Sequence, residues 1–110
     1  MRIAFKMSVH PGDEAEYKKR HNPIWPELEK TLLAHGVKSY SIFLDKEANT
    51  LFAYAEIESM ELWGKIAETQ VCRDWWQHMA PLMPTHEDGS PVSLSLQEVF
   101  HIDAPLESTQ

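Results

Sequence analysis

The chain has 110 residues, which suits a single folded domain that buries roughly 65% of the surface its unfolded form exposes. Hydrophobic residues make up 43% of the sequence and charged residues 25%, which excludes a disordered or low-complexity protein. The formal net charge of −7 would repel a phosphate backbone, so the composition argues against a nucleic acid partner.

Cysteine content and hydropathy bear on the compartment in which the protein works. Cys72 is the single cysteine, so no internal disulfide can form, and this suits a reducing compartment. No stretch approaches the roughly 18 consecutive apolar residues of a membrane-spanning helix. We therefore expect a cytoplasmic protein with no membrane partner.

The N-terminal segment has the alternation of a strand. Ile3, Phe5, Met7 and Val9 recur at every second position, which predicts a strand over residues 2–9 with one buried face. The sequence HPGD then ends the strand, and Asp13 can cap a following helix.

The helix that starts after this turn contains two prolines, Pro23 and Pro26, before it ends at Gly36. A proline disfavours helical geometry in the residue before it, and it suits the first turn of a new helix. We therefore predict one helical segment that ends at His21 and a second segment that begins at Pro26.

Three polar or aromatic side chains recur every four residues across this break: Tyr17, His21 and Trp25. Tyr17 and His21 should share one helical face, and all three should surround a concave junction. The carboxyl end of a helix favours a protonated imidazole at His21. An isolated helical histidine is nevertheless more often a surface or core residue than a catalytic one.

The rest of the chain predicts a hairpin, a second helical region and a last strand. Residues 37–44 and 51–57 are rich in β-branched and aromatic side chains and flank the turn-like sequence DKEANT. Residues 59–83 should form helix in two pieces, because Gly64 and the sequence AETQ weaken the middle. A loop over 84–93 leads to a strand over 94–102, and residues 103–110 are expected to form a frayed tail.

This order of elements predicts an α+β protein with the ferredoxin-like βαββαβ arrangement, an antiparallel sheet with both helices on one face. We expect a single domain over residues 1–102. Tyr40, Phe43, Phe52 and Tyr54 are expected to make the open face of the sheet too apolar to remain in water. The economical solution is a homodimer that packs sheet against sheet, with edge pairing as the alternative.

Tryptophan accounts for four of the eleven aromatic residues. Trp63 is expected to fill the core. Trp75 and Trp76 are neighbours, and neighbours on a helix point about 100° apart, so at least one of them should face a pocket, an interface or solvent. Flat apolar rings with one hydrogen-bond donor each suit the C–H faces of a sugar.

The common signatures of metals and nucleotide cofactors are missing from the sequence. The six histidines form no H-E-x-x-H pattern, and neither G-x-G-x-x-G nor a P-loop is present. Cys72 lies in an apolar helical stretch and is expected to be a buried structural thiol, and His86 is expected to be solvated in its loop. We therefore expect no metal and no cofactor.

Segments from all parts of the chain carry a resemblance to a known family: YKKRHNPIWPELEKTLLAHG, YSIFLD, LFAYAEIES, VCRDWWQHM and SPVSLSLQEVF. Together they resemble the L-rhamnose mutarotase family, also called rhamnose 1-epimerase, from Arg2 to about Phe100. The resemblance implies a ferredoxin-like dimeric α+β barrel. It also implies His21 as the proton donor, and these residues as the ones that bind the sugar: Tyr17, Tyr40, Trp75 and Trp76.

The implied reaction is interconversion of the α and β anomers of L-rhamnopyranose by acid/base ring opening and closure, without a cofactor. Two other classes stay open at the level of sequence. A cofactor-independent monooxygenase or a haem-degrading enzyme uses the same barrel, because a fold alone does not determine chemistry. A non-catalytic sugar-binding module would use the aromatic residues but would not need His21.

Overall fold

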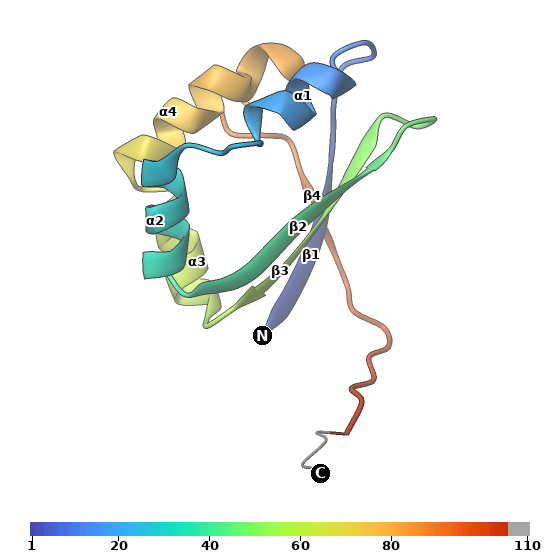
Figure 1. Ribbon diagram of the computed structural model, residues 1–110, viewed down its shortest axis with the longest axis vertical. Helices are drawn as coiled ribbons and strands as arrows, with labels where there is room; N and C mark the ends of the chain where they lie inside the picture. The colour runs from blue at the N-terminus through green and yellow to red at the C-terminus, as the bar shows by residue number, and fades with distance from the viewer. Residues whose placement is uncertain (106–110) are drawn as a thin grey trace.

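The structure is a computed structural model that describes residues 1–105. Its elements in chain order are β1 (Arg2–Ser8), α1 (Glu14–Arg20), α2 (Pro26–Ala34), β2 (Val37–Asp45), β3 (Thr50–Ile57), α3 (Met60–Ile66), α4 (Gln70–Met79), the 3-10 helix η1 (Ala80–Leu82) and β4 (Leu94–Leu96). The strands form one antiparallel sheet in the order β2-β3-β1-β4, and the helices lie on one side of it (Figure 1). The predicted ferredoxin-like α+β fold is confirmed.

The boundaries of the helices follow from local sequence. The first helical region is broken as predicted, because α1 ends at Arg20 with His21 as its C-cap and α2 begins at Pro26. The second region divides into α3 and α4, where the hydroxyls of Ser59 and Thr69 accept hydrogen bonds from the first turns of the two helices. No helix within residues 1–105 is long and apolar enough to cross a membrane.

The last strand is shorter than the sequence predicts. Only Leu94–Leu96 pair with β1, whereas the alternation of apolar residues predicts a strand over 94–102. In this register Glu98 lies opposite Arg2, which is the first residue of β1. The residues that follow Glu98 therefore have no part of β1 to pair with. Residues 99–105 extend away from the helices and the sheet (Figure 1), and Val99 is 89% exposed. Of the predicted tail, residues 106–110 lie outside the described residues.

The assignment of Tyr40 to the open face of the sheet is wrong. Side chains alternate between the two faces of a strand, so Tyr40 and Phe43 cannot share a face. Tyr40 pairs with the buried Ala55 on the helix side, while Phe43 pairs with the exposed Phe52 on the open side. The open face therefore keeps Phe43, Phe52 and Tyr54, and Tyr40 points toward the helices.

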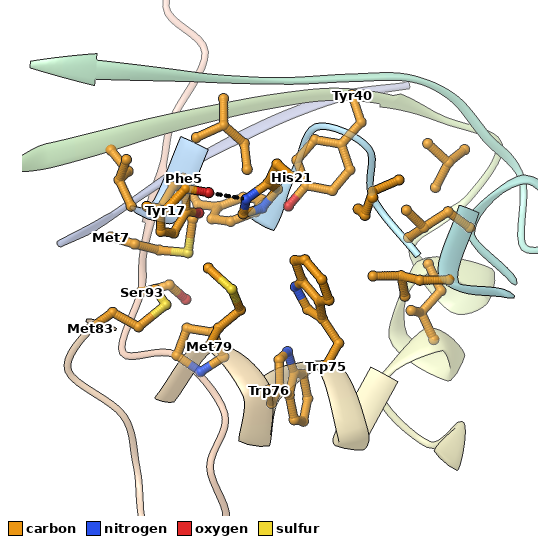
Figure 2. A pocket seen from close by; sticks show the side chains of 18 of the residues that line it. Phe5, Met7, Tyr17, His21, Tyr40, Trp75, Trp76, Met79, Met83 and Ser93 are labelled. Carbon is orange, nitrogen blue, oxygen red and sulfur yellow. Dashed lines mark hydrogen bonds between the residues drawn. The ribbon is translucent and has the colours of Figure 1, made fainter. Parts of the chain in front are cut away.

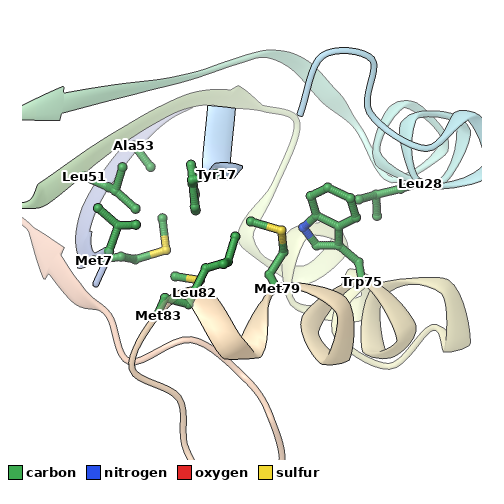
Figure 3. Packing of buried hydrophobic residues seen from close by; sticks show 10 residues of the cluster. Met7, Tyr17, Leu28, Leu51, Ala53, Trp75, Met79, Leu82 and Met83 are labelled. Atoms are coloured by element: carbon green, nitrogen blue, oxygen red, sulfur yellow. The ribbon is translucent and has the colours of Figure 1, made fainter. Parts of the chain in front are cut away.

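The core lies between the sheet and the helices. β3 contributes four nearly inaccessible side chains to this side: Leu51, Ala53, Ala55 and Ile57. Figure 3 shows Trp75, Met79 and Met83 facing the sheet, with Tyr17 beside them. The small side chains of Ala53 and Ala55 leave an unfilled volume next to the sheet. Large side chains from α1, α4 and β1 surround this volume. The core layer therefore contains the cavity in which the candidate site lies.

Candidate functional site

A cavity of about 1550 Å³ opens between the helices and the sheet. All five residues that the sequence predicts for the site border it: Tyr17, His21, Tyr40, Trp75 and Trp76. In Figure 2, Tyr17, His21 and Tyr40 lie on one wall, and Trp75, Trp76 and Met79 lie on the opposite wall. The fold thus brings aromatic residues from α1, β2 and α4 to one cavity.

His21 is held by the end of α1. Its Nδ1 lies 2.8 Å from the main-chain oxygen of Tyr17, one helical turn earlier. A carbonyl oxygen only accepts, so Nδ1 carries the hydrogen, and in the neutral ring Nε2 has the free lone pair. The ring also packs against Tyr17, with centroids 4.5 Å apart, and against the edge of Trp75 at 5.1 Å. These contacts fix both the orientation and the tautomer of the imidazole.

Burial lowers the pKa of His21 below its ordinary value, and it outweighs the hydrogen bond to Tyr17, which acts in the opposite direction. The helix end does favour the protonated imidazole as predicted, through the Tyr17 carbonyl, but removal from water has the larger effect and sets the net direction. The resting ring is neutral near pH 7. It can accept a proton at Nε2 and, once charged, return it to a nearby oxygen.

The two tyrosines offer hydroxyl groups that remain protonated. Burial raises the pKa of Tyr17 to about 12 and shifts the pKa of Tyr40 upward as well. Neither hydroxyl takes part in the side-chain hydrogen bonds found within residues 1–105. Each phenol is thus free to bond to a polar ligand in the cavity, as a donor or as an acceptor.

Both adjacent tryptophans border the cavity, whereas the angle between neighbouring side chains predicts only that at least one of them faces a pocket, an interface or solvent. Trp75 is buried and belongs to the core, while Trp76 is half-buried and packs against both core clusters. The predicted position of Trp25 is wrong. Its ring packs edge to face against Trp75 with centroids 5.1 Å apart, and it is not part of the cavity lining within the described chain. Trp25 directly precedes α2, and its ring supports the Trp75 wall of the cavity from outside.

Several cavity residues were missed from the sequence. Met7, Met79 and Met83 are buried and border the cavity together with Phe5, Trp63 and Ser93 (Figure 2). Met79 follows Trp75 by four residues and Trp76 by three, so helical spacing could have assigned it to the same face. Met83 and Ser93 carry no such signal, because they lie beyond α4 and reach the cavity only through the fold. Trp63, expected in the core, contacts Phe5 and Tyr40 at the cavity edge.

Two other reactive side chains, Cys72 and His86, also border the cavity. Within residues 1–105, no three histidine, cysteine, aspartate or glutamate side chains come together as a metal site would require. Cys72 is buried, and burial raises the pKa of its thiol to about 11, so it is not a thiolate near neutral pH. His86 lies in the loop after η1, where its side chain is exposed as expected, and it also borders the cavity.

Comparison with known proteins gives a consistent result. Residues 2–102 match the sequence model of the family described as L-rhamnose mutarotase. The L-rhamnose mutarotases of Yersinia pestis strain Pestoides F and Yersinia pseudotuberculosis strain IP 31758 are each 56% identical over 103 residues, 94% of this chain and 99% of each relative. The crystal structure of an L-rhamnose mutarotase from Formosa agariphila is 42% identical and covers 94% of this chain and 99% of its own, with a TM-score of 0.86.

More distant structures share only the fold. A candidate antibiotic biosynthesis monooxygenase from Bordetella bronchiseptica is 14% identical over 90% of this chain and 96% of its own, with a TM-score of 0.65. Identity this low supports the common α+β architecture and says nothing of the chemistry. The family match over nearly the whole chain, together with the high identity to mutarotases, shows that this chain belongs to the L-rhamnose mutarotase family.

Proposed function

We propose that this protein interconverts the α and β anomers of L-rhamnopyranose, with His21 as the group that transfers the proton. The observation that carries the proposal is a neutral imidazole with a defined tautomer beside an aromatic cavity, in a chain that is 56% identical to L-rhamnose mutarotases. The activity is that of an isomerase, an epimerase acting on a carbohydrate.

The reaction requires one proton to leave the anomeric hydroxyl and one to reach the ring oxygen. Nε2 of neutral His21 takes the proton from O1, the C1–O5 bond breaks with its electron pair moving to O5, and a C1=O1 aldehyde forms. The imidazolium then gives its proton to O5, so His21 acts as the proton donor of the ring-opening step. Rotation about C1–C2 and the reverse sequence close the ring on the other face.

One imidazole can serve both oxygens because O1 and O5 are bonded to the same carbon atom. The Tyr17 hydroxyl, which stays protonated because its pKa is about 12, is suited to donating a hydrogen bond to an oxygen that gains charge. Tyr40, Trp75 and Trp76 bind the sugar in this scheme, through one hydroxyl, two indole N–H groups and their flat apolar surfaces.

The apolar end of the cavity suits a deoxy sugar. Met7, Met79 and Met83, which we call the methionine cluster, are between 2% and 8% exposed and border the cavity. L-Rhamnose carries a methyl group where the corresponding hexose carries a hydroxymethyl group. We assign the methionine cluster to this methyl group, because a hydroxyl buried there would lose its hydrogen bonds to water.

The test of the proposed activity is NMR exchange spectroscopy on L-rhamnose with and without the protein. Exchange between the α and β anomeric signals should be accelerated by catalytic amounts of protein above the spontaneous rate in the same buffer. Tight binding without acceleration would instead identify a sugar-binding module, and the absence of both would refute the proposal.

We also propose that the protein is a homodimer, with a second copy covering the open face of the sheet. Support comes from exposed side chains on that face, where Phe43 is 65% and Leu94 is 58% exposed. Apolar area of this kind favours burial by about 25 cal/mol per Å². Light scattering at micromolar protein concentration should give twice the mass of the chain, and a monomer under these conditions would contradict the proposal.

We further propose that residues 1–102 form the whole catalytic domain and that the protein works in the cytoplasm. Removal of residues 103–110 should therefore leave activity unchanged, because every residue assigned to the reaction lies before them. The single cysteine, Cys72, suits a reducing compartment. Fractionation of the native cell, followed by immunodetection, tests the location.

A further inference from the structure

We propose that Arg20 is a positioning residue for the reaction, which holds the end of α1 against the end of α4. The two helix ends carry different halves of the site, Tyr17 and His21 on one side and Trp75 and Trp76 on the other. The inference rests on the proposed function. It concerns a residue that does not touch the cavity and whose effect passes through the orientation of His21.

The guanidinium of Arg20 makes two well-defined contacts. Its Nε donates to Oε2 of Glu16 at 2.8 Å, and its Nη1 donates to the main-chain oxygen of His78 in the last turn of α4. The arginine side chain is 24% exposed. The bond to His78 joins two helices whose bonded residues are 58 positions apart in the chain. The bond to Arg20 also lowers the pKa of Glu16, so this carboxylate stays charged. It therefore holds the Arg20 guanidinium in place.

The site needs such a link because α1 is short. Seven residues are too few for a helix to be stable by itself, so α1 depends on contacts with the rest of the fold. Its first turn is tied to the β2–β3 turn through Glu14 and Asn49. Arg20 provides the corresponding link at the other end, directly before His21. Without it, the imidazole would be oriented only by the helix end and by ring contacts such as that with Trp75.

The chemistry of the contact favours arginine over lysine. The planar guanidinium presents N–H groups in different directions, so one side chain reaches the Glu16 carboxylate and the His78 carbonyl at the same time. The carbonyl lies at the carboxyl end of α4, where main-chain oxygens have no partner within the helix. Arg20 therefore satisfies an unpaired oxygen and fixes the distance between two walls of the cavity.

The sequence offers a matched control for this role. Lys18, Lys19 and Arg20 form one basic run at the end of α1, and all three complement the helix dipole. Lys19 is exposed and makes no side-chain hydrogen bond within the described chain. Replacement of Lys19 removes the same charge from the same turn and leaves the link to α4 intact.

The experiment compares Arg20→Ala, Arg20→Lys and Lys19→Ala with the unchanged protein in the NMR exchange assay on L-rhamnose. In folded Arg20→Ala protein, we expect kcat to fall about 100-fold, since misplacement by about 1 Å has this effect, while KM changes much less. Arg20→Lys should recover part of the loss, to about 10-fold below the unchanged protein, because lysine replaces one of the two contacts. Lys19→Ala should keep kcat within about two-fold.

A second readout separates positioning from stability. The ¹⁵N signals of His21 report its tautomer and order, and they should broaden or shift in Arg20→Lys and stay unchanged in Lys19→Ala. Unchanged kcat and His21 signals in folded Arg20→Lys would overturn the proposal, even if Arg20→Ala does not fold. A lower melting temperature with normal kcat per folded molecule would also overturn it. If the unchanged protein shows no exchange activity, the proposed function itself fails.

Discussion

Replacement of His21 by alanine should separate catalysis from stability when it is compared with His35→Ala. The two histidines are a matched pair. Each lies at the carboxyl end of a helix, and each places Nδ1 against the main-chain oxygen four residues earlier, at 2.8 Å for His21 and 2.7 Å for His35. Of these two histidines, His21 borders the cavity and His35 does not.

The expected magnitudes follow from the contacts that each substitution removes. Loss of the hydrogen bond costs about 0.5–1.5 kcal/mol of unfolding free energy at either site. His21 also loses ring contacts with Tyr17 and Trp75, each worth about 0.5–1.5 kcal/mol, so His21→Ala should cost roughly 2–4 kcal/mol in total. His35→Ala should lower the melting temperature by about 4–8 °C for a domain of this size.

Turnover should distinguish the two variants far more strongly than stability does. Loss of a general acid/base group lowers kcat by about 10²–10⁴-fold, so His21→Ala should be nearly inactive, while His35→Ala should exchange anomers at close to the normal rate. The assays are thermal unfolding by circular dichroism and NMR exchange on L-rhamnose, on the same preparations. Undiminished exchange in folded His21→Ala protein would refute the assignment of His21 as the proton-transfer group.

Three further predictions follow from the site and the sheet. Because burial lowers the pKa of His21 and the neutral ring starts the reaction, kcat/KM should rise with pH to a plateau, with an apparent pKa below about 6.5; a decline between pH 6 and 8 would contradict this scheme. kcat/KM for L-mannose, which has a hydroxyl on carbon 6, should be about 10–100-fold below that for L-rhamnose, and Met79→Gln should reduce this difference between the two sugars. Equal kcat/KM values for both sugars would argue against the assignment of the methionine cluster to the methyl group. Phe43→Glu should convert the dimer to monomer in light scattering, because it buries a charge in the proposed interface, whereas an unchanged mass would locate the interface elsewhere.

Local pattern in the sequence determined much of this protein. The alternation in β1 and the hairpin strands, and the prolines between α1 and α2, predict elements that depend mainly on neighbouring residues. The proximity of Tyr17 and His21 has the same origin, because a spacing of four residues on one helix guarantees contact. Helical geometry indicated that at least one of Trp75 and Trp76 faces a pocket, an interface or solvent, and family resemblance added Tyr40 and assigned both tryptophans to the sugar.

Tertiary structure decided the features that depend on residues far apart in the chain. The length of β4 depended on where β1 begins, and the contribution of Met83 to the cavity depended on the path of the chain beyond α4. The direction of the pKa shift of His21 could not be read from its position at a helix end, because burial is a property of the assembled core and here outweighs the dipole. Arg20 belongs with these features: in the sequence it is one of three basic residues on a helix, and only the approach of α4 brings a carbonyl oxygen within its reach.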